Sequence, residues 1–292
     1  MDGRIALASG EWRAEIRTQG VELVVLRRGS RDLLWRQDPK WWEWTAPILF
    51  PVVARSPANT VRVDGKPFPM PSHGFARDRE FRVLDRGPAH ATLELLDDAQ
   101  TRAHYPFAFA LRFEVRVGAA GFFMAAEIEN RDATPIPFGY GYHPAFVWPQ
   151  DLAARAGHVC LFEANETETI RRGDMTTGLL RRTRFPCPVA GRTLTLDDSL
   201  FVDGALQFDR LASRRLWFGR PGEEGLEIGF PDSPHLGIWT KPGAPYLCVE
   251  PWQGFAEEEG ADGELSRRPG MRLLAPGERA RYRLTVNVTA AA

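Results

Sequence analysis

Two titratable residues stand in stiff, apolar stretches of this chain. His143 lies within FGYGYHPAFVWP, residues 138–149, and Glu250 ends the apolar run YLCV, just before Pro251 and Trp252. An imidazole titrates at about pH 6.5, so it can give and retrieve a proton under cellular conditions, and burial would raise the pKa of a carboxyl group toward that range. The two residues are therefore candidates for an acid and a base. The competing interpretation is a buried structural histidine with one hydrogen bond and a strand-end carboxylate paired with an arginine.

Further polar residues occur in rigid, aromatic-rich segments. His73 and Arg77 are four positions apart in PSHGFARDREF, and Arg55 follows PILFPVVA. A guanidinium group offers a planar fork of donors that suits vicinal hydroxyl groups or a phosphate. A structural ion pair of Arg77 with Asp78 is the alternative.

Alternating hydrophobicity predicts that strands position these residues. In FAFALRFEVRV, residues 107–117, apolar side chains take every odd position, and RYRLTVNV, residues 281–288, repeats the pattern. The run 122–130 is expected to be the return strand of a hairpin that starts at 107–117. VELVVLRR and ATLELL are further strand candidates, and Asp64-Gly65 in VRVDGKPF predicts a tight hairpin turn.

Helices are expected to be few and short. The chain has 23 prolines and 27 glycines, which are costly in helices but natural between short strands. The arginine- and proline-rich segment from about Glu163 to Pro188 is expected to be a long loop. No linker or repeat stands out, so residues 1–292 are expected to form one all-β domain of packed antiparallel sheets.

Composition excludes several classes of function. The 37 lysines and arginines nearly balance the 38 acidic residues, which gives no reason to expect nucleic acid or an anionic membrane as a partner. No segment has a signal-peptide or membrane-spanning pattern. Three cysteines without C-x-x-C spacing suggest neither a disulfide framework nor a zinc site. We expect a cytoplasmic protein.

The familiar nucleotide-binding, metalloprotease and serine-hydrolase motifs are absent from the sequence. HGFARDREF, GYHPAF and CVEPW, in this order, instead resemble the aldose 1-epimerase (mutarotase) superfamily, in particular its LacX-like branch. The resemblance extends from PILFP to APGERARYRLTVNV. It implies a large antiparallel β-supersandwich of the galactose mutarotase-like type, a small sugar as partner, and neither metal nor other cofactor.

The resemblance also assigns roles. It implies that His143 protonates the ring oxygen of a pyranose and that Glu250 takes the proton of the anomeric hydroxyl group. His73, Arg77 and Arg55 are expected to bind sugar hydroxyl groups. Asp203 is expected to do the same, although relatives have two acidic residues where this chain has Asp203 and Gly204, and Asp209 nearby is the alternative.

The resemblance leaves some neighbouring residues open. Glu257 follows Ala256, where relatives usually carry an aspartate, so it is a candidate to replace that residue, with a solvated acidic loop as the alternative. Several aromatic residues are candidates for a sugar platform or for the rim of the pocket, with core packing as the alternative: Phe75, Tyr142, Trp239, Trp252, Trp41, Trp42 and Trp44. The other four histidines, at positions 90, 104, 158 and 235, are expected to be structural.

Together these inferences predict a cofactor-free aldose 1-epimerase acting on a free aldose. A hexose-6-phosphate epimerase, with Arg55 and Arg77 on the phosphate, is the second interpretation. A sugar-binding protein of the same fold without turnover is the third. The sequence identifies neither the sugar nor the oligomeric state.

Overall fold

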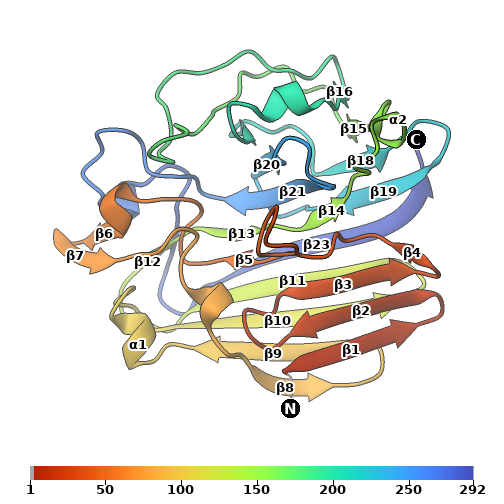
Figure 1. Cartoon of the computed structure of the whole chain (residues 1–292). Coiled ribbons are helices and arrows are strands. Elements are labelled where there is room, and N and C mark those ends of the chain that lie inside the picture. Colours follow the sequence, from red (N-terminus) through yellow and green to blue (C-terminus); the bar gives the residue numbers. More distant parts are fainter. Residues whose placement is uncertain (1–2, 292) are drawn as a thin grey trace.

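Antiparallel sheets are the main regular structure of the molecule in this computed structural model, which describes residues 3–291 (Figure 1). Met1, Asp2 and Ala292, at the ends of the expected domain, lie outside the described residues. Every pairing between named strands is antiparallel, as the alternating sequence pattern predicts. Within residues 3–291 the α-helices are single turns, α1 (Ala99–Arg102) and α2 (Leu152–Arg155), so the expectation of few and short helices is confirmed.

A nine-stranded sheet is the largest unit of the fold. Its strands, in spatial order, are β16 (Thr193–Thr195), β15 (Val159–Phe162), β18 (Arg215–Gly219), β19 (Glu224–Gly229), β23 (Arg279–Ala290), β11 (Gly121–Asn130), β10 (Phe109–Gly118), β9 (His90–Leu96) and β8 (Arg82–Arg86). β10 and β11 form the hairpin expected at 107–130, and β23 contains the strand expected at 281–288.

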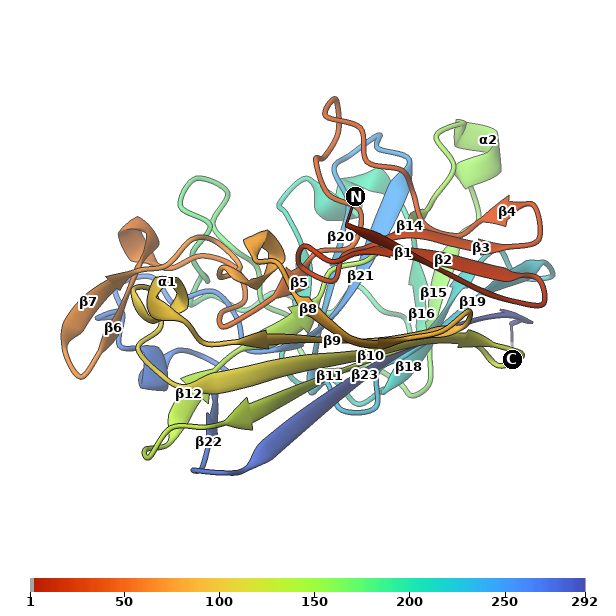
Figure 2. The ribbon, with the colours of Figure 1, turned by 90° about the horizontal axis from the view of Figure 1, so that it is seen from below.

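A four-stranded sheet covers part of one face of this large sheet. It consists of β1 (Arg4–Ser9), β2 (Trp12–Arg17), β3 (Leu23–Arg28) and β4 (Arg31–Asp32). Figure 2 shows β1 to β3 lying over β9, β10 and β11. The apolar side chains that these layers turn toward one another, such as Ile16, Leu26, Phe113 and Val115, are buried in one continuous core. This layered sandwich is the architecture that the resemblance implies.

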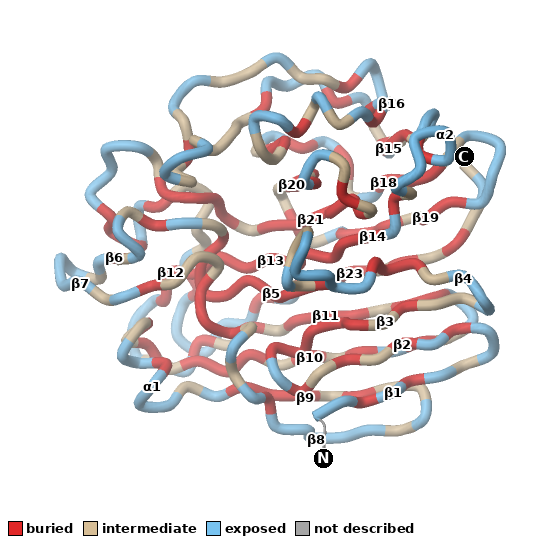
Figure 3. The backbone as a smooth tube through the Cα atoms, in the orientation of Figure 1, coloured by how far each residue is buried: buried red, intermediate tan, exposed pale blue. Residues whose placement is uncertain are grey.

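A third sheet carries the site. Its strands, in spatial order, are β17 (Leu206–Phe208), β20 (His235–Trp239), β21 (Tyr246–Gln253), β13 (Tyr140–Tyr142) and β5 (Ile48–Leu49), and β14 (Ala145–Val147) also pairs with β21. β21 is buried along almost its whole length, as its apolar sequence requires (Figure 3).

Two small pairs of strands complete the structure. β12 (Ile136–Phe138) pairs with β22 (Arg272–Leu274), and β6 (Thr60–Val63) pairs with β7 (Lys66–Pro69). Asp64 and Gly65 connect β6 and β7 with φ angles of 51° and 75°, so the predicted hairpin turn is confirmed. The segment 163–188 contains no named helix or strand and runs as the expected long loop, although Ile170 and Leu180 within it are buried.

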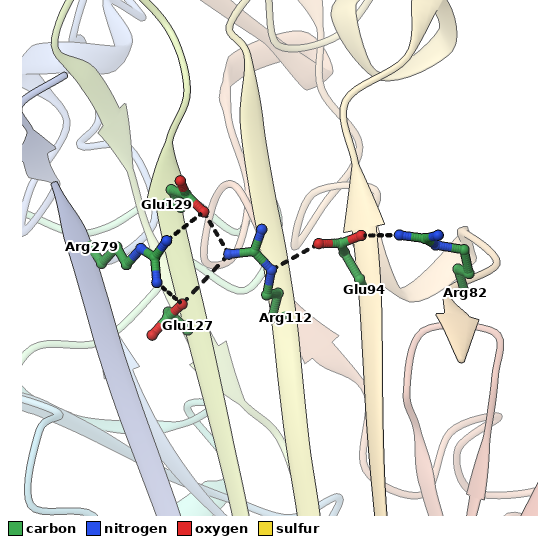
Figure 4. A network of polar contacts seen from close by, with 6 residues as sticks. All are labelled: Arg82, Glu94, Arg112, Glu127, Glu129 and Arg279. Carbon is green, nitrogen blue, oxygen red and sulfur yellow. Dashed lines mark hydrogen bonds and ion pairs between the residues drawn. The ribbon is translucent and has the colours of Figure 1, made fainter. Parts of the chain in front are cut away.

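Ion pairs cross the outer face of the nine-stranded sheet (Figure 4). Glu94 on β9 forms ion pairs with Arg82, at 2.7 Å on one side, and with Arg112, at 2.8 Å on the other. Arg112 also forms an ion pair with Glu129, at 2.5 Å. Glu94 is only 6% exposed. Although its burial raises the pKa of Glu94, the hydrogen bonds from the two arginines bring it below the ordinary value. These pairs tie neighbouring strands together at the face that the core does not cover.

Candidate active site

The strand register brings His143 and Glu250 together. β13 and β14 both pair with β21, and the same register pairs Gly141 with Trp252 and Ala145 with Cys248. His143 lies between β13 and β14, so this register puts it opposite Glu250, and directly opposite residues of an antiparallel pair project from the same face. One strand pairing thus brings together two residues that are 107 positions apart in the chain.

The two side chains are in contact. Nε2 of His143 lies 3.1 Å from Oε2 of Glu250, and the side chains are 9% and 2% exposed. Burial lowers the pKa of His143 to about 3 and raises the pKa of Glu250 well above its ordinary value. Both shifts have the same cause, because burial disfavours the charged form of each group, so the short contact joins a neutral imidazole to a carboxyl group whose protonated form burial favours.

A pocket of about 280 Å³ opens above this pair. Its lining residues are Trp42, Trp44, Ala54, His73, Arg77, His143, Ala205, Gln207, Trp239, Glu250 and Trp252. Four of them are tryptophans, which offer apolar faces to the C–H groups of a sugar. The ring of Trp42 lies 4.7 Å from the imidazole of His143, and the ring of Trp239 meets it edge-on at 5.9 Å.

Two glycines make room for the Trp252 indole at the pocket. A Cβ atom on Gly141 would lie 2.6 Å from Cδ1 of Trp252, and a Cβ atom on Gly237 would lie 2.6 Å from its Cη2 and Cζ2 atoms. Gly237 is also the residue that β20 places opposite Glu250. The indole of Trp252 can therefore extend over Gly237, a position that has no side chain and lies next to the acid–base pair.

His73 lies at one side of the pocket in a defined tautomer. The backbone N–H of Ala54 donates a hydrogen bond to Nδ1 of His73 at 3.1 Å, which leaves Nε2 as the protonated nitrogen of the neutral ring. Burial lowers the pKa of His73 well below its ordinary value, and the positive charges of neighbouring groups lower it further. His73 is thus a neutral donor near pH 7. Its backbone has a φ of 67°, a strained conformation typical of functional sites.

Arg77 lies next to His73 in the pocket lining. Its Nη2 donates to the carbonyl of Ser72 at 3.0 Å, and its guanidinium group lies 4.8 Å from the centre of the Trp44 ring. Its Nε is buried without a hydrogen-bond partner among the described residues. The weak contact of Arg77 with Asp78, at 3.9 Å, leaves most of its donors for other partners.

A buried arginine supports the loop behind His73. The guanidinium of Arg268 donates to the carbonyl oxygens of Phe255, at 2.7 Å, and of Arg55, at 3.0 Å, and also to the Val53 carbonyl and the Ser56 hydroxyl. Burial lowers the pKa of Arg268 to about 10. These bonds fix the backbone around Ala54. The sequence reasoning missed this residue, because SRRPG resembles an ordinary charged loop.

The structure does not bring every expected residue to the pocket. Arg55 is exposed, and its side chain packs beside Gly178. Asp203 is also exposed, and Asp209 forms an ion pair with Arg184 at 2.6 Å. None of these three residues lines the pocket, so their expected sugar contacts stay predictions.

The remaining candidates divide between pocket and core. Trp42, Trp44, Trp239 and Trp252 line the pocket, whereas Phe75 and Tyr142 are buried in the main core. Glu257 is buried outside the pocket lining, with its pKa raised by burial. The four histidines expected to be structural all have partners elsewhere: Asp85, the carbonyl oxygens of Pro69 and Arg155, and the Gly254 N–H.

One group of side chains at the centre of the site has the donor atoms of a metal site. One ligand atom from each of His143, Cys248 and Glu250 lies within 4.8 Å of the others. Imidazole, thiolate and carboxylate are ligands of zinc, but burial raises the pKa of Cys248 well above its ordinary value, so its thiolate forms only at a cost. Proton exchange between His143 and Glu250 does not need Cys248.

Comparison with known proteins agrees with this fold. The sequence profile of the family described as aldose 1-epimerase matches residues 3–286. The chain belongs to the aldose 1-epimerase family. The LacX protein encoded on the chromosome of Lactococcus lactis subsp. lactis is 28% identical over 273 residues, which cover 90% of this chain and 91% of that relative.

Solved structures of similar proteins have the same architecture. A galactose mutarotase-like protein from Lactobacillus casei ATCC 334 superimposes with a TM-score of 0.92 at 26% identity, covering 98% of this chain and all of the other. A galactose mutarotase related enzyme from Lactobacillus acidophilus gives a TM-score of 0.86 at 26% identity, with 98% of both chains covered. The expected galactose mutarotase-like fold of this family member is therefore confirmed, and no helix within residues 3–291 is long and apolar enough to cross a membrane.

Proposed function

We propose that this protein is an aldose 1-epimerase that interconverts the α and β anomers of a free aldose. The single observation that carries the proposal is the 3.1 Å contact between Nε2 of His143 and Oε2 of Glu250 at a tryptophan-lined pocket. The proposal treats residues 1–292 as one catalytic domain. It also keeps a cytoplasmic location and a small sugar as partner, as expected from the sequence.

The reaction needs one proton donor and one proton acceptor. Glu250 takes the proton of the anomeric hydroxyl group as the ring C–O bond breaks, and His143 gives a proton to the ring oxygen, which yields the open-chain aldehyde. Rotation about the bond between the first two sugar carbons presents the other carbonyl face. Ring closure then returns both protons, so no net proton is gained or lost.

The electrostatics of the pair suit this exchange. Transfer of the carboxyl proton of Glu250 to His143 across their 3.1 Å contact creates an ion pair without bringing net charge into a buried site, and in that state Glu250 can accept a proton and His143 can donate one. A sugar whose anomeric hydroxyl group contacts Glu250 and whose ring oxygen contacts His143 would then give one proton to the carboxylate and receive one from the imidazolium. Each positioned acid or base typically supplies roughly 10²–10⁴-fold in rate.

The substrate-binding side of the pocket suits a neutral sugar. His73 offers one N–H donor, and Arg77 offers the guanidinium group among the lining residues. A second arginine for a phosphate was expected at position 55, which is exposed and outside the lining. These observations favour a free aldose over a hexose 6-phosphate.

Anomer exchange measured by NMR tests the proposal. Magnetisation-transfer rates between α and β anomers would be recorded for glucose, galactose, xylose and arabinose, and for glucose 6-phosphate. We expect faster exchange of at least one free sugar, and a smaller effect on glucose 6-phosphate. Equal rates with and without the protein for every sugar would contradict an enzymatic function, and a preference for the phosphorylated sugar would contradict the free aldose as substrate.

A further inference from the structure

Gln207 is a polar side chain of the pocket to which the sequence analysis gave no role. It belongs to β17, lines the pocket, and is 7% exposed. Its side-chain Oε1 is buried without a hydrogen-bond partner among the described residues. An unpaired buried amide oxygen has lost its hydrogen bonds to water without replacing them, so native proteins rarely retain one without a reason.

The backbone holds Gln207 firmly on the face of the acid–base pair. Its N–H donates to the Arg171 carbonyl at 3.1 Å, and the Arg171 N–H donates to the Gln207 carbonyl at 2.8 Å. On its other side β17 pairs with β20, which places Gln207 opposite Gly237. With both edges of the strand bonded, the side chain cannot turn to the other face without breaking this pairing.

One cross-strand row connects Gln207 with the catalytic pair. Gly237 is opposite Gln207 on one side and opposite Glu250 on the other, and the register of β21 continues the row to His143. Gln207 is thus two strand spacings from Glu250, on the order of 10 Å between backbones. Gly237 between them has no side chain, and the Trp252 indole lies against it. The row presents a proton-transfer pair, a flat apolar surface and an amide.

The groups along this row match the groups of a monosaccharide that lies flat against the Trp252 ring. Reaction occurs at the anomeric carbon, the C–H groups pack on an aromatic ring, and a hydroxyl group remote from the anomeric carbon needs a partner. A glutamine side chain provides one acceptor and two donors, so it can pair with a hydroxyl group in either sense. We propose that Gln207 is a specificity-determining residue that hydrogen-bonds a ring hydroxyl group of the sugar away from the anomeric centre.

The proposal rests on the proposed function for the identity of the ligand as a sugar. It gives the amide of Gln207 the role that the family resemblance assigned to Asp203, whose side chain is exposed and outside the pocket lining. An uncharged amide binds a hydroxyl group without bringing another carboxylate close to Glu250. Selectivity among sugars then depends on the configuration of one hydroxyl group.

Deoxy sugars and a Gln207→Met variant test the proposal together. The best aldose of the NMR panel and its 2-, 3-, 4- and 6-deoxy forms are compared for the wild type, Gln207→Met and Gln207→Asn, with both KM and kcat measured. We expect Gln207→Met to raise KM about tenfold for the parent sugar, which corresponds to ~1.4 kcal/mol, with kcat changed less than threefold. For one deoxy sugar the wild type and Gln207→Met should have the same KM. Gln207→Asn, which is one methylene shorter, should resemble Gln207→Met.

The controls separate this proposal from the proposed function. Gln150→Met, at an exposed position outside the pocket lining, should leave every constant unchanged. An unchanged KM for the parent sugar in Gln207→Met, or the same loss for all four deoxy sugars, would overturn the role of Gln207. If the wild type binds sugars without exchanging their anomers, the proposed function fails and the same comparison is made with dissociation constants. A wild type that binds none of the sugars would overturn both.

Discussion

Gly237 and Trp252 fit together so closely that a Cβ atom on the glycine would lie 2.6 Å from the indole ring. Because the ring is large, 3% exposed and part of the pocket lining, the open space beside it is the pocket itself. The absent side chain at position 237 is therefore part of the shape of the pocket.

A Gly237→Ala variant should displace the indole and weaken sugar binding. We expect KM to rise at least tenfold, with an unfolding free energy lowered by about 1–3 kcal/mol through overpacking. Anomer-exchange kinetics and thermal unfolding measure the two effects. Gly118→Ala is the matched control, because a Cβ atom there meets nothing within 4 Å. Wild-type kinetics in Gly237→Ala would show that the close fit does not shape the pocket.

Glu250→Gln should make the protein inactive but more stable at neutral and alkaline pH. Burial raises the pKa of Glu250 above its ordinary 4.5, so between that pH and the raised value the folded protein holds a proton that the unfolded chain has lost. The free energy of unfolding therefore falls as the pH rises, by up to about 1.4 kcal/mol per pH unit. Glutamine has no such proton, so the melting temperature of Glu250→Gln should exceed that of the wild type by a margin that grows from pH 5 to pH 8.

The exposed Glu43 provides the control for this measurement. Glu43→Gln should leave the melting temperature within about a degree of the wild type at each pH, since exposed substitutions change stability by less than about 0.5 kcal/mol. A melting temperature of Glu250→Gln at or below the wild-type value at every pH would contradict the raised pKa.

His73 should stay neutral through the whole range in which the protein is active. Its pKa lies well below the ordinary 6.5, and its Nδ1 accepts the Ala54 N–H. We therefore expect ¹⁵N NMR of the ring to show a protonated Nε2 and an unprotonated Nδ1 from pH 6 to pH 8. Arg268→Lys, which cannot supply all the bonds that hold the loop around Ala54, should produce a mixture of tautomers. Titration of wild-type His73 near pH 6.5 would be inconsistent with this geometry.

Glu94→Gln should lower the free energy of unfolding by about 1–3 kcal/mol at pH 7, because the buried carboxylate accepts from Arg82 and Arg112. The pKa of Glu94 is below its ordinary 4.5, so the stabilisation is fully present above that pH and is lost as the pH falls through the lowered value. Urea unfolding should therefore show a large difference in the free energy of unfolding between Glu94→Gln and the wild type at pH 7, and a small difference at pH 3. Glu114→Gln, at the more exposed pair with Arg281, is the control and should cost less than about 1 kcal/mol. Equal effects of both variants would argue against a special role of burial at Glu94.

The sequence predicts the long strands and tight turns well, and the pairing of short strands poorly. Alternation over 107–117 and 281–288 is decisive because one face of each strand is buried in the core. β13 and β14 have only three residues each, and their common pairing with β21 joins segments about 100 positions apart. Nothing local in the chain specifies that register, so family resemblance was needed to connect His143 with Glu250.

In the candidate site, too, the local sequence predicts some features and long-range packing decides the others. His73 and Arg77 come to the pocket because one compact turn carries both, whereas Arg55 and Asp203 remain exposed on neighbouring loops. Gln207 did leave a signal, since it is a polar residue inside the short apolar run ALQF. Such a residue on a strand faces solvent, a hydrogen-bond partner or a cavity, and only the packing of the third sheet decides among the three.

The central claim is that His143 and Glu250 act as one proton-transfer unit on a sugar. The most direct test compares anomer-exchange rates of the wild type, His143→Asn, Glu250→Gln and the double variant, after confirming that each still binds the sugar. We predict that each single variant loses at least 10²-fold and that the double variant is no slower than the slower single variant. Single variants that keep the wild-type rate, or losses that multiply in the double variant, would contradict the claim.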